Sequence, residues 1–200
     1  MKKLDQLFNE SSSVADFGFK YFNYLNSLLN KINKDELNNF VDLILKAREN
    51  QSSIFFIGNG GSASTCSHFA NDLSIGTKSL DNPIKAYCLN DNIPIMTAIG
   101  NDYGFEEIFF QQVKIHLKKN DILVAISASG NSNNLIKAIA LANKLGGISV
   151  SITGFDGGNL SKISQNLIHI PTEIGDYGPA EDGHLIINHL VSNYLLRKFN

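Results

Sequence analysis

A short apolar run, a cluster of glycines and a helical pattern follow one another near residue 54, and this order constrains the fold most. Residues 54–57 are apolar, enough for a buried strand and too few for a buried helix. Gly58, Gly60 and Gly61 then interrupt the pattern, and a helix is expected over about 62–75. Glycines let backbone N–H groups approach a ligand, and a helix N-terminus favours negative charge. The stretch therefore predicts an anion-binding turn.

The helix predicted after this turn carries two side chains that can bind metal or transfer protons. His68 and Asp72 stand four residues apart, which places them on the same helix face. They begin about a turn and a half beyond the glycines. The combination of an anion-binding turn with this pair predicts the beginning of an active site.

Composition and charge exclude several classes of protein. A net charge of −2 without a basic cluster argues against nucleic-acid binding. No apolar run reaches the length of a membrane span, and the N-terminus lacks the apolar core of a signal peptide. The only cysteines, Cys66 and Cys88, have no metal-type spacing and are expected to be reduced and buried. We expect a cytoplasmic protein that binds neither nucleic acid nor membrane.

The first fifty residues predict two amphipathic helices. Apolar residues recur at helical spacing from Phe17 to Ile32, and Asp35 is a candidate cap for a second helix reaching Leu45. They offer more apolar surface than one sheet face needs. We interpret residues 1–50 as a helical hairpin that packs on the rest of the chain and on a partner subunit; covering this subunit's own core is the alternative.

From residue 54 onward strand and helix patterns alternate, which predicts a mostly parallel sheet covered on both faces. The expected strands are 54–57, 84–89, 122–126, 149–153 and 167–170. The expected helices are 62–75, 92–100, 104–118, 132–145, 157–164 and 180–198. The fold class is α/β, a three-layer sandwich with a five-stranded sheet, in a single domain over 1–200 with its core at 51–200. Ligands of such sheets bind beyond the carboxyl ends of the strands.

The loop after the third strand, Ser127-Ala-Ser-Gly-Asn-Ser132, offers many neutral donors to one anionic group. It contains three hydroxyls and a glycine and leads into a helix N-terminus. It has no lysine, and the P-loop pattern for nucleotide triphosphates is absent. A sugar phosphate fits these donors better, and the alternative is a turn that only caps the helix.

Two further loops are candidates for simpler roles. Asn101 and Asp102 could cap a helix from Gly104, or present an amide and a carboxylate to sugar hydroxyls. The turn at 153–158 is interpreted as structural.

Two acids and two histidines gather where the last helix begins. They are Glu181, Asp182, His184 and His189. A lone histidine here would usually be a core residue. Together with His68 and Asp72, however, the group makes a histidine and carboxylate metal site plausible.

These motifs, taken together and in this order, resemble the sedoheptulose 7-phosphate isomerases (phosphoheptose isomerases) of the sugar-isomerase (SIS) domain superfamily. The motifs are Gly58-Asn-Gly-Gly-Ser62, His68-Phe-Ala-Asn-Asp72, Asn101-Asp-Tyr-Gly-Phe-Glu-Glu107, Ser127-Ala-Ser-Gly-Asn-Ser132, Thr153-Gly-Phe-Asp-Gly-Gly158 and the late pair of histidines. The resemblance covers nearly the whole chain. It implies a SIS, flavodoxin-like fold and conversion of sedoheptulose 7-phosphate to D-glycero-D-manno-heptose 7-phosphate, the first step of heptose biosynthesis for lipopolysaccharide or another surface polysaccharide.

The resemblance also implies a homotetramer with zinc in each active site. It places the phosphate on Ser127, Ser129 and Ser132 with the Ala128 backbone. It places the sugar against Asn59, Gly60, Gly61, Asn101, Asp102 and Glu181. It assigns the metal to His68, Asp72, Glu181 and His189, with Asp72 or Glu181 as the base and His189 as the acid.

The sequence departs from the family at the metal positions. Asp72 replaces the usual glutamate, Glu181 replaces the usual glutamine, and the entry from Asp176 to Asp182 lacks the usual arginine. Asp182 is an alternative to Glu181. These changes add negative charge and leave open the identity of the base, the metal and the stereochemistry of the substrate.

Three other functions are alternatives for a chain with these motifs. A non-catalytic adaptor resembling the DnaA initiator-associating protein is the first alternative, but that relative lacks the full histidine and carboxylate set. A sugar-phosphate-sensing regulatory module is the second, and no DNA-binding segment is attached here. A dinucleotide-binding fingerprint is the third, and its third glycine and its acidic residue are missing.

Overall fold

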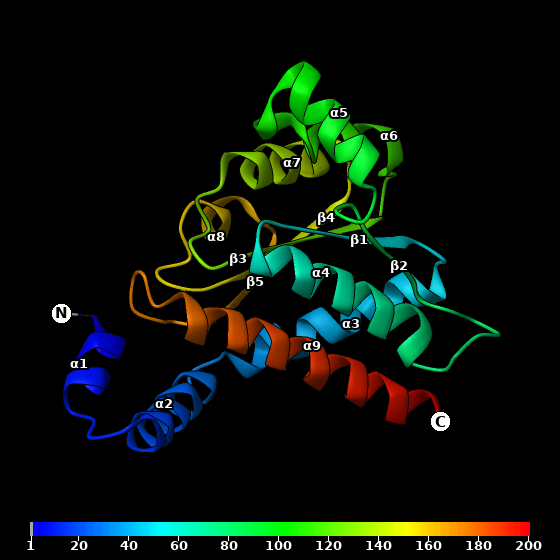
Figure 1. Ribbon diagram of the computed structural model, residues 1–200. Helices are drawn as coiled ribbons and strands as arrows, with labels where there is room; N and C mark the ends of the chain where they lie inside the picture. Colours follow the sequence, from blue (N-terminus) through cyan, green and yellow to red (C-terminus); the bar gives the residue numbers. More distant parts are fainter. Residues whose placement is uncertain (1) are drawn as a thin grey trace.

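The computed structural model describes residues 2–200 and places a parallel sheet between two layers of helices (Figure 1). The strands are β1 (Ser53–Gly58), β2 (Lys85–Cys88), β3 (Ile122–Ser127), β4 (Ile148–Thr153) and β5 (Asn166–His169). Their order in the sheet is β2-β1-β3-β4-β5, and every pairing is parallel. The predicted α/β sandwich and its five strands are confirmed, and no strand end differs from its prediction by more than one residue.

The order of the strands determines where a ligand can bind. The chain passes from β1 to β2 on one side and then crosses to β3 on the other, so β1 and β3 are neighbours that end together. Gly58 pairs with Ile126 at this end. In open parallel sheets a crevice forms at such a reversal, beyond the carboxyl ends of the strands. The loops after β1 and β3 therefore lie side by side.

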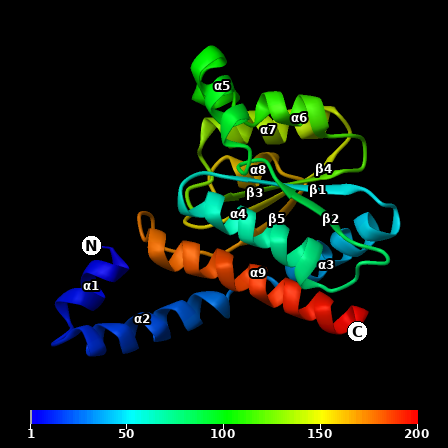
Figure 2. The ribbon, with the colours of Figure 1, turned by 45° about the vertical axis from the view of Figure 1, so that its right-hand side comes forward.

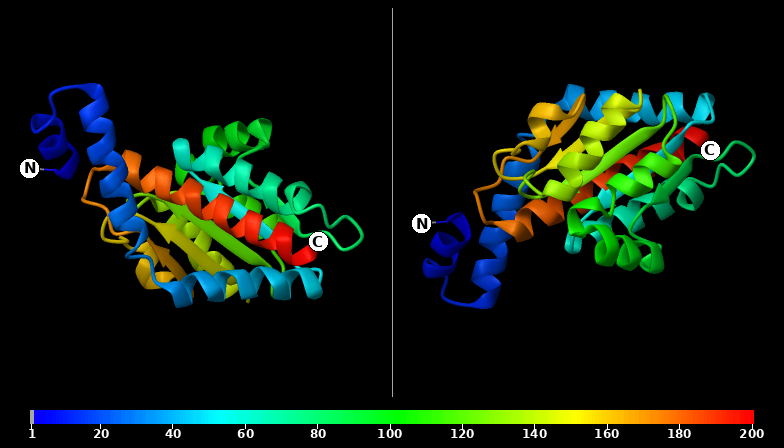
Figure 3. Two further views of the ribbon diagram at one scale, coloured as in Figure 1. Left: turned by 90° about the horizontal axis from the view of Figure 1, so that it is seen from below. Right: turned by 90° about the horizontal axis from the view of Figure 1, so that it is seen from above.

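Two sets of helices cover the two faces of the sheet (Figure 3). One face carries α3 (Lys34–Glu49), α4 (Gly61–Asn71) and α9 (Tyr177–Phe199). The other carries α5 (Ile93–Tyr103), α6 (Phe110–His116), α7 (Asn133–Lys144) and α8 (Leu160–Ile163). Side chains alternate along a strand, so Ile54 and Phe56 enter the first core while Phe55 and Ile57 enter the second.

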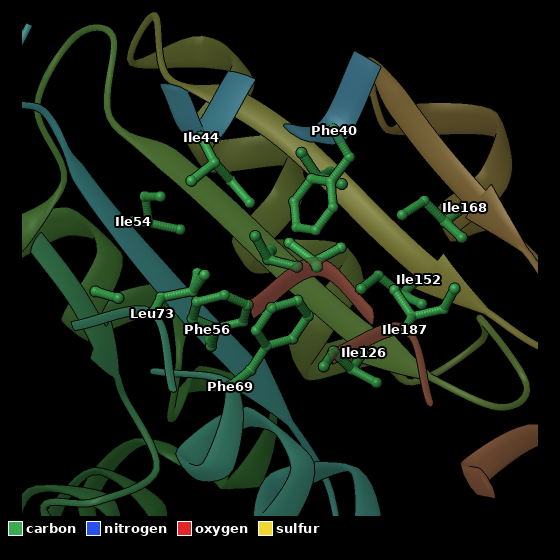
Figure 4. Close-up of a cluster of buried hydrophobic side chains, with 14 of the residues drawn as sticks. Phe40, Ile44, Ile54, Phe56, Phe69, Leu73, Ile126, Ile152, Ile168 and Ile187 are labelled. Atoms are coloured by element: carbon green, nitrogen blue, oxygen red, sulfur yellow. The ribbon is translucent and has the colours of Figure 1, made fainter. Parts of the chain in front are cut away.

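The first core holds α4 and α9 against the sheet (Figure 4). Phe69 of α4 stacks on Phe56 of β1, with ring centroids 4.9 Å apart. Phe40 of α3 meets the same Phe69 ring edge-on, and Ile187 anchors α9 in the same cluster. Burying a large apolar side chain contributes about 1.5–3 kcal/mol. The core therefore fixes both helices that carry the histidines.

The N-terminal segment contains three helices instead of the two predicted. A short α1 (Lys3–Asn9) precedes α2 (Val14–Leu29), and α1 and α2 pack together. Figure 2 shows them projecting beyond the sheet at the end where α9 begins, whereas α3 crosses the sheet. The hairpin is thus formed by α1 and α2. Asn33, whose side chain accepts from the Asp35 N–H, caps α3, so the prediction of Asp35 as the cap is wrong.

Other predicted helices differ in their bounds for identifiable reasons. The expected helix over 104–118 is divided into a 3-10 turn, Phe105–Glu107, and α6, with a turn at residues 108–109 between them; Gly104, with a φ of 97°, separates the 3-10 turn from α5. The expected helix over 157–164 is reduced to Leu160–Ile163, because Gly157 and Gly158 also have positive φ. The last helix begins earlier than predicted, at Tyr177. Directly after α4, residues Asp72–Gly76 form one turn of π-helix.

Within residues 2–200, no helix combines the length and the apolar character needed to cross a bilayer.

Candidate active site

The loops after β1 and β3 are joined by a reciprocal pair of side-chain amides. We call residues 58–61 the glycine loop and residues 127–132 the serine loop. Asn59 donates to Asn134 over 3.0 Å, and Asn134 donates back to Asn59 over 2.9 Å. Asn134 is buried at the start of α7. The pair therefore fixes the glycine loop relative to the helix that the serine loop begins.

The serine loop is held open by its own hydrogen bonds and by the turn after β4. The Ser127 hydroxyl accepts from the Gly130 N–H over 3.1 Å. Gly130 has a φ of 64°, and a Cβ there would lie 2.1 Å from the Gly157 carbonyl oxygen. Likewise, a Cβ on Gly158 would lie 2.3 Å from the Ser129 carbonyl oxygen. The turn at 153–158 thus has the structural role predicted for it.

A polar cavity of about 160 Å³ lies between these loops. It is lined by Asn59, Ser62, Ile126, Ser127, Ala128, Ser129, Ser132, Tyr177 and Glu181. Its volume corresponds to roughly five water molecules in bulk, a size suited to one phosphate group with its hydration. The Ser132 hydroxyl makes no capping bond to α7 and is free to donate into the cavity. Ser62 and Tyr177 belong to this site but were not predicted; their positions in the first turns of α4 and α9 are the signal that could have found them.

Glu181 closes one end of this cavity. A Cβ on Gly61 would lie 2.8 Å and 2.9 Å from the two carboxylate oxygens of Glu181. The carboxylate therefore rests against the first residue of α4, where the helix dipole favours a negative charge. Gly60, with a φ of 55° and open space around it, turns the chain into that helix.

A second group of polar side chains lies farther along α4 and α9, and we call His68, Asp72 and His189 the metal triad. One ligand atom from each lies within 4.8 Å of the others. The His68 Nε2 and Asp72 Oδ2 are 3.4 Å apart, and the rings of His68 and His189 are 5.0 Å apart between centroids. Neighbouring ligand atoms on a tetrahedral Zn²⁺ are roughly 3.4 Å apart. Two imidazoles and a carboxylate at these separations could hold a metal ion.

The structure brings together only part of the predicted site. Glu181 is not in the metal triad, because it precedes His189 by eight residues, or about 12 Å along α9. Asn101 and Asp102 are exposed in the last turn of α5, where Asn101 donates to Asp102 over 2.8 Å. They therefore do not cap the next helix, and they do not line the cavity. Their contact with sugar stays a prediction.

Asp182 and His184, the two other polar residues predicted near the start of α9, lie outside both the cavity and the metal triad. The Tyr21 hydroxyl of α2 donates to Asp182, and burial together with this carboxylate raises the pKa of Tyr21. Asp182 thus contacts the N-terminal helices. His184 is fully buried, and among residues 2–200 neither of its ring nitrogens has a hydrogen-bond partner, although the Thr153 backbone lies near. Burial lowers the pKa of His184 to about 4, so the ring is neutral at pH 7.

Two remaining features belong to the packing. A cavity of about 400 Å³ on the other face is mainly apolar, with Phe55 stacked between Tyr87 and His116. It offers no set of donors comparable to the serine loop. Cys66 and Cys88 are free and buried, as predicted.

Comparison with known proteins identifies the family. Residues 20–154 match the SIS domain family. A phosphoheptose isomerase from Helicobacter pylori is 37% identical over 166 residues, which is 83% of this chain and 85% of that protein. The chain belongs to the phosphoheptose isomerase family of SIS domain proteins. The resemblance expected from the sequence motifs is confirmed.

Solved structures of phosphoheptose isomerases share this fold. GmhA from Neisseria gonorrhoeae superimposes with a TM-score of 0.82 at 29% identity, covering 91% of this chain and 96% of that one. A phosphoheptose isomerase from Francisella tularensis gives a TM-score of 0.84, with coverage of 92% and 99%. At 24% identity the second likeness concerns the fold alone. The family members found are isomerases by name, so the adaptor alternative is not favoured.

Proposed function

We propose that this SIS domain protein is an isomerase that converts sedoheptulose 7-phosphate to D-glycero-D-manno-heptose 7-phosphate. The observation that carries the proposal is the placement of two polar sites along one pair of packed helices. The serine-loop cavity lies where α4 and α9 begin, and the metal triad lies farther along both. The first suits a phosphate and the second suits carbonyl chemistry.

The separation of the two sites matches the length of a heptose phosphate. His68 follows Gly61 by seven residues and His189 follows Glu181 by eight, which is about 10–12 Å along each helix. Eight bonds join C1 of a heptose to a phosphorus on O7. At about 1.2 Å of advance per bond in an extended chain, they span roughly 10 Å. A phosphate in the cavity would thus place C1 and C2 near the metal triad.

The side chains at the carbonyl end supply an acid and a base. The Asp72 carboxylate removes a proton from C1, while His189 donates a proton to the carbonyl oxygen on C2, giving an enediol. His189 then takes the proton from the oxygen on C1, and Asp72 returns its proton to C2. The carbonyl has moved to C1, and both side chains are restored. Glu181 lies nearer the phosphate, where it holds sugar hydroxyls.

His68, Asp72 and His189 would hold a zinc ion through one ring nitrogen of each histidine and one carboxylate oxygen, which leaves the second oxygen of Asp72 and the second ring nitrogen of His189 for the proton transfers. Bound there, the metal supplies Lewis-acid stabilisation of the negative charge that develops on the enediol oxygens.

We also propose that the protein acts as a homotetramer, with residues 1–50 packing subunits around the core at 51–200. Phe8, Phe19 and Phe22 of α1 and α2 are each more than 60% exposed, which is unusual for three phenylalanines in one short segment. His68 and His189 are also partly open to solvent, so a neighbouring subunit could complete the site.

The test is an isomerase assay with sedoheptulose 7-phosphate, run with added zinc and with a chelator. Formation of the aldose heptose phosphate, lost with the chelator and restored by zinc, is the expected result. Fructose 6-phosphate, one carbon shorter, should be a poorer substrate because its carbonyl does not reach the metal triad. No turnover of the heptose by a folded protein loaded with zinc would overturn the proposal.

A further inference from the structure

Asn188 is a fully buried side chain in contact with the metal triad. It stands on α9 immediately before His189, and its Nδ2 donates to Asp72 Oδ2 over 3.2 Å. The same carboxylate oxygen is the one that lies 3.4 Å from His68 Nε2. The Asn188 amide thus holds the Asp72 carboxylate beside His68.

Packing alone does not hold Asp72 in this direction. Its other side faces a cavity of about 130 Å³, lined by Asp72, Gly76, Ser192, Asn193 and Leu196. Because position 76 is glycine, its missing side chain leaves this space free next to the carboxylate. Asp72 is also where α4 becomes a π-helix, a distortion that changes the direction of side chains and is frequent at functional sites. Directional hydrogen bonds therefore select one rotamer. Asn71 donates to Asp72 Oδ1 over 3.2 Å from the neighbouring position in sequence, whereas Asn188 donates to Asp72 Oδ2 from α9 and is the bond that holds the oxygen nearest His68.

The side-chain oxygen of Asn188 is unpaired in the core. Its Oδ1 is buried and has no hydrogen-bond partner within the described part of the chain. An unpaired buried polar atom costs about 1–3 kcal/mol, so a leucine of similar volume would suit the core better. The position is thus better explained by what the Nδ2 does than by packing.

We propose that Asn188 is a positioning residue, which orients the Asp72 carboxylate toward His68 and His189 and so sets the affinity of the triad for a divalent metal. The inference rests on the metal centre of the proposed function. Side chains that hold a ligand from behind typically change metal affinity by about 10–100-fold when removed.

The test measures metal affinity and stability separately. Co²⁺ is titrated into metal-free wild type, Asn188→Leu and Asn188→Ala, and its visible absorption gives Kd. We expect Kd to rise about 10–100-fold in both variants. The melting temperature of metal-free Asn188→Leu should stay equal or increase, because the unpaired Oδ1 is gone. If Asn188 only supported the packing, the Kd for Co²⁺ would stay unchanged and the melting temperature would fall. Asn188→Ala gives the answer if the leucine variant does not fold.

Asn143→Leu is the matched control. Asn143 of α7 also donates one bond, to the Ile163 carbonyl over 2.8 Å, and also has an unpaired buried Oδ1, but it lies on the other face of the sheet. Its replacement should leave the Kd for Co²⁺ unchanged. Wild-type affinity in the folded Asn188 variants would refute the role of Asn188 while leaving an active isomerase in place. An Asn188-dependent affinity in a protein that does not turn over heptose phosphate would support the role and refute only the function.

Discussion

The carboxylate of Glu181 rests against Gly61, so close that a side chain at position 61 would overlap it. The nearest approach of an added Cβ is 2.8 Å, to Glu181 Oε2. The two residues are 120 positions apart and come from the N-terminal parts of two packed helices, Gly61 from the first residue of α4 and Glu181 from the fifth residue of α9. This contact connects the glycine loop to α9 and defines one wall of the phosphate-sized cavity.

Gly61→Ala should reduce catalysis without unfolding the protein. The added methyl group displaces the Glu181 carboxylate, and a shift of about 1 Å in a site can lower the rate about 100-fold. Alanine also raises helix propensity by about 1 kcal/mol, which offsets the crowding. Steady-state kinetics on sedoheptulose 7-phosphate would measure kcat/KM. Gly18→Ala in α2, where the new Cβ meets nothing within 4 Å, is the control, and equal kcat/KM values for the two variants would contradict the prediction.

Ser132→Ala should raise KM for the phosphorylated substrate. The hydroxyl makes no capping bond to α7, so its loss costs little stability. A hydrogen bond to a charged group contributes about 1.5–3 kcal/mol, which corresponds to roughly a 10–100-fold change in KM. Ser27→Ala, which removes an exposed hydroxyl bonded to the Tyr24 carbonyl, should leave KM unchanged. An unaltered KM in Ser132→Ala would show that this hydroxyl does not hold the phosphate.

His189→Ala should abolish turnover and metal binding while the oligomer persists. The imidazole is one of three groups in the metal triad and is exposed, so its removal leaves the core intact. Zinc content after dialysis, turnover and the mass of the assembly in solution would be measured together. His116→Ala, an exposed histidine stacked on Phe55 at the other face, is the comparison. Full zinc content and wild-type turnover in His189→Ala would refute the site.

His184 should make the protein less stable as the pH falls from about 6.5 to about 4. Burial lowers its pKa in the folded state to about 4 from an ordinary value of 6.5. Between these values the unfolded chain takes up a proton that the folded chain does not. The free energy of unfolding therefore decreases as the pH is lowered. The full effect of this one group is about 3 kcal/mol and is complete near pH 4.

Chemical denaturation of wild type and His184→Leu at several pH values would isolate this contribution. The difference in unfolding free energy between the two proteins should change by about 3 kcal/mol between pH 7 and pH 4. A difference that is independent of pH would mean that the buried imidazole becomes protonated as easily in the folded protein as in the unfolded one.

The sequence by itself determined the elements of the sheet and the chemistry of its loops. The strands at 54–57 and 122–126 are predictable because each is a short apolar run, and those at 84–89 and 149–153 because polar and apolar residues alternate in them. The serine loop and the glycine loop are also predictable, because the residues of each are contiguous in sequence. The separate α1 and the cap at Asn33 were missed, because weak local patterns at the N-terminus fit more than one helix boundary.

Only the tertiary structure decided which polar side chains meet. Glu181 and Asp182 are consecutive acids at the start of one helix, and neighbours on a helix point about 100° apart. The packing of α9 against α4 and α2 turns Glu181 to Gly61 and Asp182 to Tyr21. The same packing brings His189 to His68 and places Asn188 behind Asp72. No local pattern encodes such contacts, because their geometry depends on how apolar side chains from distant segments fill a common core.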